Sequence, residues 1–143
     1  GSTVTELATM SFKIDIVDHD LVSGHLAVQL ADGKAKIFSI NDGALSKSGI
    51  SRSSALMLRL LPDGRFLSIS ATSSGYKVSC GDAELAVVKS RGCLLRFAVQ
   101  SEERFAFSTS DGSLFIVDRE TSTNLVSHQF DTPVVAMYWT VDG

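Results

Sequence analysis

The chain has 143 residues, of which 44% are hydrophobic and 20% are charged, and its formal net charge is −3. This composition is typical of a soluble globular protein of about one domain with a sizeable core, and it excludes an intrinsically disordered chain. The slightly negative charge excludes the overall basic bias of a dedicated nucleic-acid binder. No run of about 18 apolar residues predicts a membrane-spanning helix.

The first third of the chain alternates apolar and polar residues in short runs, as half-buried strands do. Two of these runs flank Asp32-Gly33, a dipeptide typical of tight hairpin turns. Asp18-His19-Asp20 is expected to end the first run. The strands predicted here are Phe12–Ile16, His25–Leu30, Lys34–Ile40 and Ala44–Ser48.

The same order of four strands is predicted twice more, after a loop rich in serine and glycine at Ser46–Ser54. No segment has the 3.6-residue apolar period of a helix, so the chain is predicted to be all-β. The second set is Ala55–Leu60, Arg65–Ala71, Gly75–Cys80 and Glu84–Lys89. The third set is Cys93–Val99, Arg104–Thr109, Leu114–Asp118 and Leu125–Phe130, and an extra strand at Val134–Thr140 follows it.

The repeat has a measurable period. Arg65-Phe66 and Arg104-Phe105 lie 39 residues apart. A four-stranded unit of about 40 residues is the length of one β-propeller blade. We therefore predict a single partial propeller domain over residues 1–143, with antiparallel four-stranded blades at about 11–48, 55–89 and 93–130 and an extra strand at 134–140.

Three turn motifs carry a resemblance to the WD-repeat β-propeller family. Ser110-Asp111-Gly112 leads into a strand that ends at Asp118, as the family's serine-aspartate-glycine turn does. Leu61-Pro62-Asp63-Gly64 is similar to the family's turn between the first two strands of a blade, and Tyr138–Gly143 resembles the same turn at the start of another blade. The resemblance implies a non-catalytic scaffold for protein–protein interactions, with no cofactor.

The repeats depart from the family where its tryptophan would stand, because Phe38, Cys80 and Val117 take that place. The family's histidine–serine–aspartate–tryptophan hydrogen-bond network is therefore not encoded. We expect the packing of apolar faces between neighbouring blades to hold the units in place instead.

Three units and one strand are fewer than the four to eight blades of a closed propeller. We expect the chain to be part of a larger propeller, completed by further sequence, by a second polypeptide or by a copy of itself. The uncovered ends of a three-blade stack would otherwise invite pairing with another chain.

Four basic residues are predicted to lie on one loop face: Lys47, Arg52, Lys89 and Arg91. Together with nearby serine hydroxyls they offer donors for an acidic or phosphorylated peptide, although the interpretation we favour at this point is that they are solvated loop charges. The opposite face is predicted to be acidic, with Asp18, Asp20, Asp42, Asp63, Asp82, Glu102, Glu103, Glu120 and Asp142. The serines are Ser46, Ser48, Ser51, Ser53 and Ser54.

Other candidates are weaker. Asp18-His19-Asp20 contains ligand types for zinc and groups for acid–base chemistry, but no third and fourth ligands follow at a suitable spacing, so a polar turn is favoured. Trp139 is either an exposed aromatic anchor or, as we favour, a core residue of a fourth blade. Cys80 and Cys93 are expected to be buried free thiols, with a disulfide as the alternative, which favours a reducing, cytoplasmic location.

The function that this pattern favours is a protein–protein interaction scaffold within a larger assembly. One alternative is a propeller-fold hydrolase with its site at the central channel, and the other is a nucleic-acid-binding module that uses the basic loop face. The innermost strands carry no histidine at the positions that a channel site needs, and the basic face has no interleaved aromatics.

Overall fold

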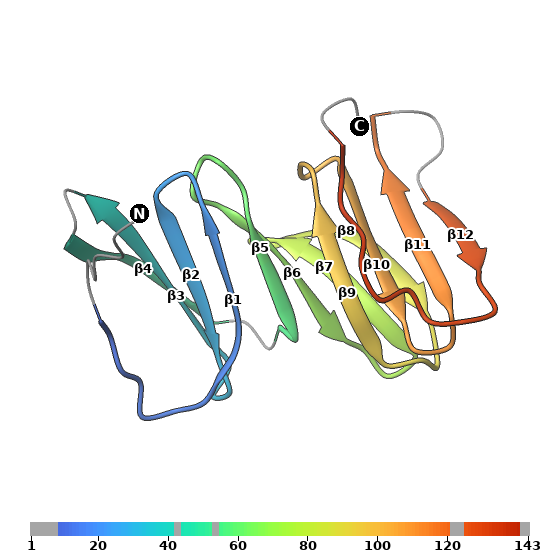
Figure 1. Cartoon of the computed structure of the whole chain (residues 1–143), viewed down its shortest axis with the longest axis horizontal. Helices are drawn as coiled ribbons and strands as arrows, with labels where there is room; N and C mark the ends of the chain where they lie inside the picture. The colour runs from blue at the N-terminus through green and yellow to red at the C-terminus, as the bar shows by residue number, and fades with distance from the viewer. Residues whose placement is uncertain (1–8, 42–43, 53–54, 121–124, 141–143) are drawn as a thin grey trace, which may run out of the picture.

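The structure, a computed structural model, describes residues 9–41, 44–52, 55–120 and 125–140. Within these ranges the chain forms twelve strands in three antiparallel four-stranded sheets, and no helix there is long and apolar enough to cross a membrane (Figure 1). Sheet 1 contains β1 (Ile16–Val22), β2 (His25–Leu30), β3 (Lys34–Asn41) and β4 (Ala44–Arg52). Sheet 2 contains β5 (Met57–Leu60), β6 (Phe66–Ala71), β7 (Gly75–Cys80) and β8 (Ala83–Lys89). Sheet 3 contains β9 (Leu94–Val99), β10 (Arg104–Thr109), β11 (Ser113–Asp118) and β12 (Leu125–Gln129).

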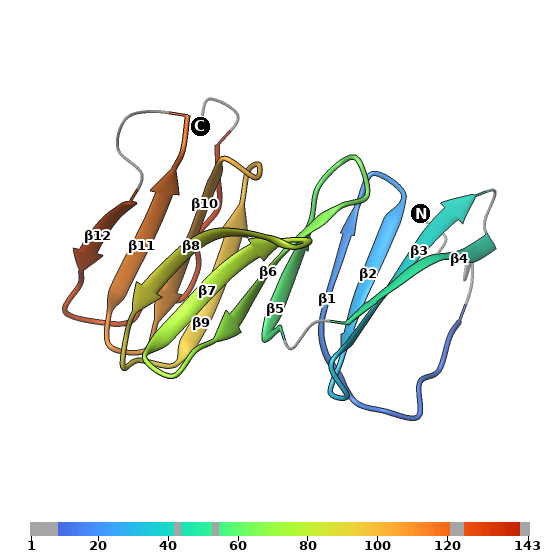
Figure 2. The ribbon, with the colours of Figure 1, turned by 180° about the vertical axis from the view of Figure 1, so that it is seen from behind.

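The three sheets stack side by side along the long axis of the molecule, as the front and back views show (Figures 1 and 2). Within each sheet the strands are arranged in chain order, and the first strands contact one another from sheet to sheet, β1 with β5 and β5 with β9. The first strands are therefore the inner strands of the stack, and the prediction of four-stranded propeller blades is confirmed.

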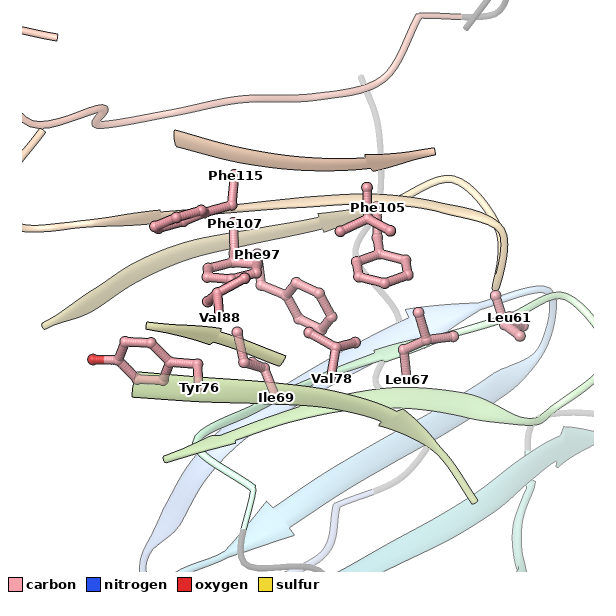
Figure 3. Packing of buried hydrophobic residues seen from close by; sticks show 11 residues of the cluster. Leu61, Leu67, Ile69, Tyr76, Val78, Val88, Phe97, Phe105, Phe107 and Phe115 are labelled. Carbon is pink, nitrogen blue, oxygen red and sulfur yellow. The ribbon is translucent and has the colours of Figure 1, made fainter. Parts of the chain in front are cut away.

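Apolar packing between sheets 2 and 3 forms the largest core of the molecule (Figure 3). The rings of Phe107 and Phe115 stack with their centroids 4.9 Å apart, and Phe97 meets Phe105 edge to face at 6.5 Å. Leu67, Ile69 and Val78 face these rings from sheet 2. Each buried phenylalanine contributes roughly 1.5–3 kcal/mol, so this packing supplies the cohesion that the absent tryptophan network supplies in regular repeats.

Sheets 1 and 2 meet through a smaller apolar cluster of Ala27, Ala35, Ile37, Leu58 and Leu60. Ala27, Ala35 and Leu58 have no exposed surface. Ala27 of β2 and Ala35 of β3 both lie in sheet 1. Their small side chains let sheet 1 approach sheet 2 closely, because little side-chain volume separates the backbones.

Each inner strand has one edge that pairs with no other strand of its sheet. Charged side chains of the preceding inner strand form hydrogen bonds with the backbone groups along this edge. The Leu58 amide donates to Asp18 Oδ2 at 2.8 Å, and the Leu60 amide donates to Asp20 Oδ2 at 2.7 Å. Arg59 donates from Nη1 to Asp18 Oδ2 at 2.7 Å and from Nε to the Phe97 carbonyl at 3.1 Å. Arg59 therefore joins all three sheets at the inner end of the stack.

This arrangement corrects the prediction for the start of the chain. The first strand is β1, Ile16–Val22, and not Phe12–Ile16. Asp18-His19-Asp20 lies within β1, and not in a turn, because Asp18 and Asp20 find backbone donors on β5. Phe12 lies before the strand and packs against Phe38 on the other side of sheet 1.

Two further segments differ from expectation. The serine- and glycine-rich stretch predicted as a loop continues β4 as far as Arg52, where the strand still pairs with Lys34 of β3. An outer strand needs few apolar residues, so its composition resembles that of a loop. The expected extra segment at Val134–Thr140 runs beside β9 (Figure 1), but it belongs to none of the three sheets.

We predict that Arg59→Met destabilises the fold. The Asp18 carboxylate and the Phe97 carbonyl each lose a charged donor, so the free energy of unfolding should fall by about 2 kcal/mol. Urea denaturation measures this loss. The matched control is Arg65→Met, which removes the exposed ion pairs with Asp63 and Glu102 and should cost less. Equal losses in the two variants would contradict the role given to Arg59.

Candidate functional site: a basic groove between sheets 2 and 3

A groove of about 900 Å³ lies where the β6–β7 turn, the β8–β9 connection and the β10–β11 turn meet. Its charged residues are Lys89, Arg91 and Asp111. The other residues that line it are Ala71, Thr72, Ser73, Ser74, Gly75, Tyr76, Ser90, Gly92 and Cys93. Two cations and several hydroxyl groups therefore share one open surface.

The connection that carries Arg91 is held at both ends by hydrogen bonds. The Tyr76 hydroxyl donates to the Gly92 carbonyl at 2.7 Å, and the Ser90 amide donates to the Ser74 carbonyl at 3.1 Å. The Cys93 amide donates to Ser110 Oγ at 2.8 Å. Arg91 therefore extends from a preformed loop, which lowers the entropy cost of binding.

Glycine is required at two positions along this groove because neighbouring atoms leave no room for a side chain. A Cβ atom on Gly75 would overlap the Val88 carbonyl oxygen. A Cβ atom on Gly92 would lie 2.9 Å from Asp111 Oδ1. The small residues thus bring the three loops into contact.

The groove carries two positive side chains, Lys89 and Arg91, and one negative side chain, Asp111. Asp111 Oδ1 accepts from the Thr109 hydroxyl at 2.6 Å and from the Ser113 amide at 3.2 Å. The Thr109 hydrogen bond, helped by the Ser113 amide, lowers the pKa of Asp111, so this carboxylate stays ionised and bonded within its own turn. Lys89 and Arg91 are both exposed, and neither forms an ion pair with another described residue.

The structure brings together only two of the four predicted basic residues. Lys89 ends β8 and Arg91 follows it, and both line the groove. Lys47 and Arg52 were predicted in a loop, but both lie in β4, where Lys47 pairs with Phe38 and Arg52 with Lys34. The hydroxyl groups of the groove are also not the predicted ones, because they come from Thr72, Ser73, Ser74 and Ser90.

The predicted acidic face is correspondingly smaller. Asp18 and Asp20 lie on the inner strand β1 and bind β5, while Asp42 and Asp142 fall outside the described residues. Of the other residues of that face, Asp63 and Glu102 bind Arg65, which lies between them. Ser53 and Ser54 also fall outside the described residues. No group of three or more histidine, cysteine or acidic residues in the described ranges is arranged to hold a metal ion.

The two cysteines have different environments. Cys80 is half-buried, and burial raises the pKa of its thiol. Cys93 is exposed at the groove, so the prediction that both thiols are buried is wrong for Cys93. Both are free thiols in the structure.

Sequence reasoning did not find Tyr76 or the Thr72–Ser74 turn. Tyr76 is one of two tyrosines, and its position at the start of β7, one residue after Gly75, gave no sign that its hydroxyl reaches a loop sixteen residues later. The only available signal was the serine-rich turn between two strands of the second repeat.

Comparison with solved structures places this geometry among known folds. The chain is similar to the computationally designed Ika4 protein, with a TM-score of 0.61, 19% identity and coverage of 97% of this chain and 88% of that chain. It is also similar to the WD40 repeats of RRP9, with a TM-score of 0.60, 11% identity and coverage of 87% and 42%. For the β-propeller domain of Cps50 (Swd1) from Myceliophteria thermophila the values are 0.60, 14%, 83% and 43%.

The fold is that of a β-propeller. Several of the similar structures are WD40 propellers, which agrees with the WD-repeat-like turns of the sequence. The chain spans less than half the length of the RRP9 and Cps50 chains that it matches. No protein-family model and no curated protein sequence matches it.

We predict that Tyr76→Phe loosens the groove without disturbing the core. The ring stays packed against Phe107, but the hydrogen bond to Gly92 is lost, so the free energy of unfolding should fall by about 1 kcal/mol. Amide hydrogen exchange at residues 90–93 should become faster. Tyr138→Phe is the matched control because Tyr138 is 85% exposed, and it should change neither measurement. Unchanged exchange at residues 90–93 in Tyr76→Phe would show that this bond does not order the loop.

Proposed function

We propose that the chain is a WD-repeat-type propeller segment that acts as a non-catalytic scaffold for protein–protein interactions within a larger assembly. The observation that carries this proposal is the basic groove, which is open, preformed and built from loops at one end of two packed sheets. Rigid loops on a β-scaffold are a common location for recognition sites.

The ligand that fits the groove is an acidic or phosphorylated segment of another protein. Arg91 and Lys89 supply charged donors without an internal ion pair among the described residues, and the Ser73 and Ser74 hydroxyls supply neutral ones. Guanidinium and ammonium groups form stronger hydrogen bonds with carboxylate and phosphate oxygens than with neutral acceptors. The groove is open to solvent, so a segment of another protein can reach it.

The charged residues near the inner strands support a structural role more than a catalytic one. Asp18, Asp20 and Arg59 are each committed to hydrogen bonds that hold neighbouring sheets together. A hydrolase site at the axis would need such groups to be turned toward a substrate.

The proposal includes completion of the propeller by other polypeptide and a reducing, cytoplasmic location. The natural propellers that the chain resembles are about twice as long as the matched region, which supports completion. The free thiols at Cys80 and Cys93 support a reducing compartment.

The test is charge reversal in the groove. We expect the double variant Lys89→Glu, Arg91→Glu to lose at least about tenfold in affinity for a phosphoserine peptide and for a glutamate-rich peptide, as two exposed cations become repulsive. Fluorescence anisotropy at two salt concentrations measures the affinity, which should weaken as salt is raised.

Lys47→Glu is the control because Lys47 carries the same charge on β4, away from the groove, and it should leave the affinity unchanged. Equal binding by the double variant and the parent chain would overturn the proposed site. Tighter binding to RNA than to either peptide, abolished by the same variant, would favour the nucleic-acid-binding alternative.

A further inference from the structure

Residues 134–140 lie against sheet 3 without belonging to a sheet. Arg96 of β9 donates from Nε to the Val135 carbonyl at 2.8 Å, and Trp139 donates from Nε1 to the Ala98 carbonyl at 3.2 Å. The segment therefore runs beside the inner strand of sheet 3, where Figure 1 shows it as a red tube.

The two backbone carbonyls that Arg96 binds correspond to the two that Arg59 binds. Arg59 donates from Nε to a carbonyl of the next inner strand, at Phe97, and from Nη1 to the Leu58 carbonyl just before it. Arg96 donates from Nε to Val135 and from Nη1 to the Leu95 carbonyl just before it. The segment at 134–140 is therefore placed next to β9 in the same way as β9 is placed next to β5. It occupies the position of a fourth inner strand.

The burial of residues 136–140 alternates as it does in a strand packed on one side. Met137 and Trp139 are partly buried, whereas Tyr138 between them is 85% exposed. In β5 the corresponding pair, Leu58 and Leu60, is buried against the preceding sheet, and the Nε atom of Arg59 between them reaches Phe97 of the following one. Met137 and Trp139 therefore face sheet 3, and Tyr138 faces the open end of the stack.

The sequence fixes the register of this comparison. Leu60 is followed by Leu61-Pro62-Asp63-Gly64, and Trp139 is followed by Thr140-Val141-Asp142-Gly143. Trp139 thus corresponds to Leu60, and Tyr138 corresponds to Arg59. In sheet 2, Leu60 and Leu58 direct their amides to the inner edge, so Arg59 directs its backbone groups to its ladder partner Leu67.

We propose that the outer edge of residues 134–140 is a docking site for an antiparallel β-strand, which binds through the backbone groups of Ala136 and Tyr138. The occupant is the second strand of a further blade. By analogy with β6 it places a large apolar side chain opposite Trp139, as Phe66 lies opposite Leu60, and a small polar one opposite Met137, as Ser68 lies opposite Leu58.

The exposed side chains at this end fit such an occupant. Tyr138 is 85% exposed, Val126 is 47% exposed and Phe130 is 41% exposed, so the surface that a following sheet would cover is apolar. The inference rests on the proposal that the chain is an incomplete propeller, and it does not depend on the basic groove.

The experiment supplies the strand within the same chain. A copy of Arg65–Lys89, which forms β6–β8 of sheet 2, is added after Gly143, so that the added strand follows an Asp-Gly pair as β6 does. Trp139 is the only tryptophan and the added copy contains none, so it reports on this edge alone. We expect its emission to shift to shorter wavelength and its quenching by acrylamide to fall, relative to the chain without the extension.

The matched control carries Leu67→Pro and Ile69→Pro in the added copy only. Proline removes the amides that would pair with Tyr138 and Ala136, so the shift and the loss of quenching should both disappear. An extension that leaves Trp139 emission and quenching unchanged would overturn the inference. So would a concentration-dependent dimer of the unextended chain with a shielded Trp139, because a second copy would then occupy the edge.

Peptide binding to the groove, measured on the same extended chain, separates this result from the proposed function. Shielding of Trp139 without peptide binding would support the docking edge and overturn the proposal that the groove binds a peptide. Peptide binding without shielding of Trp139 would support the groove and overturn the docking edge.

Discussion

The stack depends on the contacts that Arg59 makes at its inner end. This one side chain bonds to Asp18 of sheet 1, to its own strand in sheet 2 and to Phe97 of sheet 3. Inner strands have a free edge, and unpaired backbone groups there would be costly where water is excluded. Side chains of neighbouring sheets satisfy that edge, and the apolar clusters then fill the space between the sheets.

This construction explains how a propeller is kept without the tryptophan network of regular WD repeats. Phe107, Phe115 and Phe105 fill the interface between sheets 2 and 3. The hydrogen bond from Arg59 to the Phe97 carbonyl joins the inner strands of these two sheets. The loops at one end of the two best-packed sheets are consequently fixed, and the groove with Lys89 and Arg91 lies on them. The residues that line the groove and the residues of the proposed docking edge at 134–140 do not overlap.

The sequence predicted the all-β fold, the period and most strands, because alternating residues and Asp-Gly turns are local signals. β7 and β10 match their predicted bounds. It failed where a tertiary contact overrides the local pattern: Asp18 and Asp20 resemble a turn until β5 supplies their donors, and β4 resembles a loop until β3 pairs with it. The sequence predicted Lys89 and Arg91 as site residues because they lie where β8 ends. It did not predict the hydrogen bond from Tyr76 to Gly92 that fixes their loop, because the two residues are sixteen positions apart, with β8 between them.

Amide hydrogen exchange at Leu58 and Leu60 tests the central claim most directly. Both amides lie on the free edge of β5, and only the side chains of Asp18 and Asp20 protect them. If the inner strands are joined as described, these two amides exchange as slowly as the ladder amides of Leu67 and Ile69. Exchange at the rate of open edge amides, with Leu67 and Ile69 still protected, would show that the sheets are not joined at a common axis.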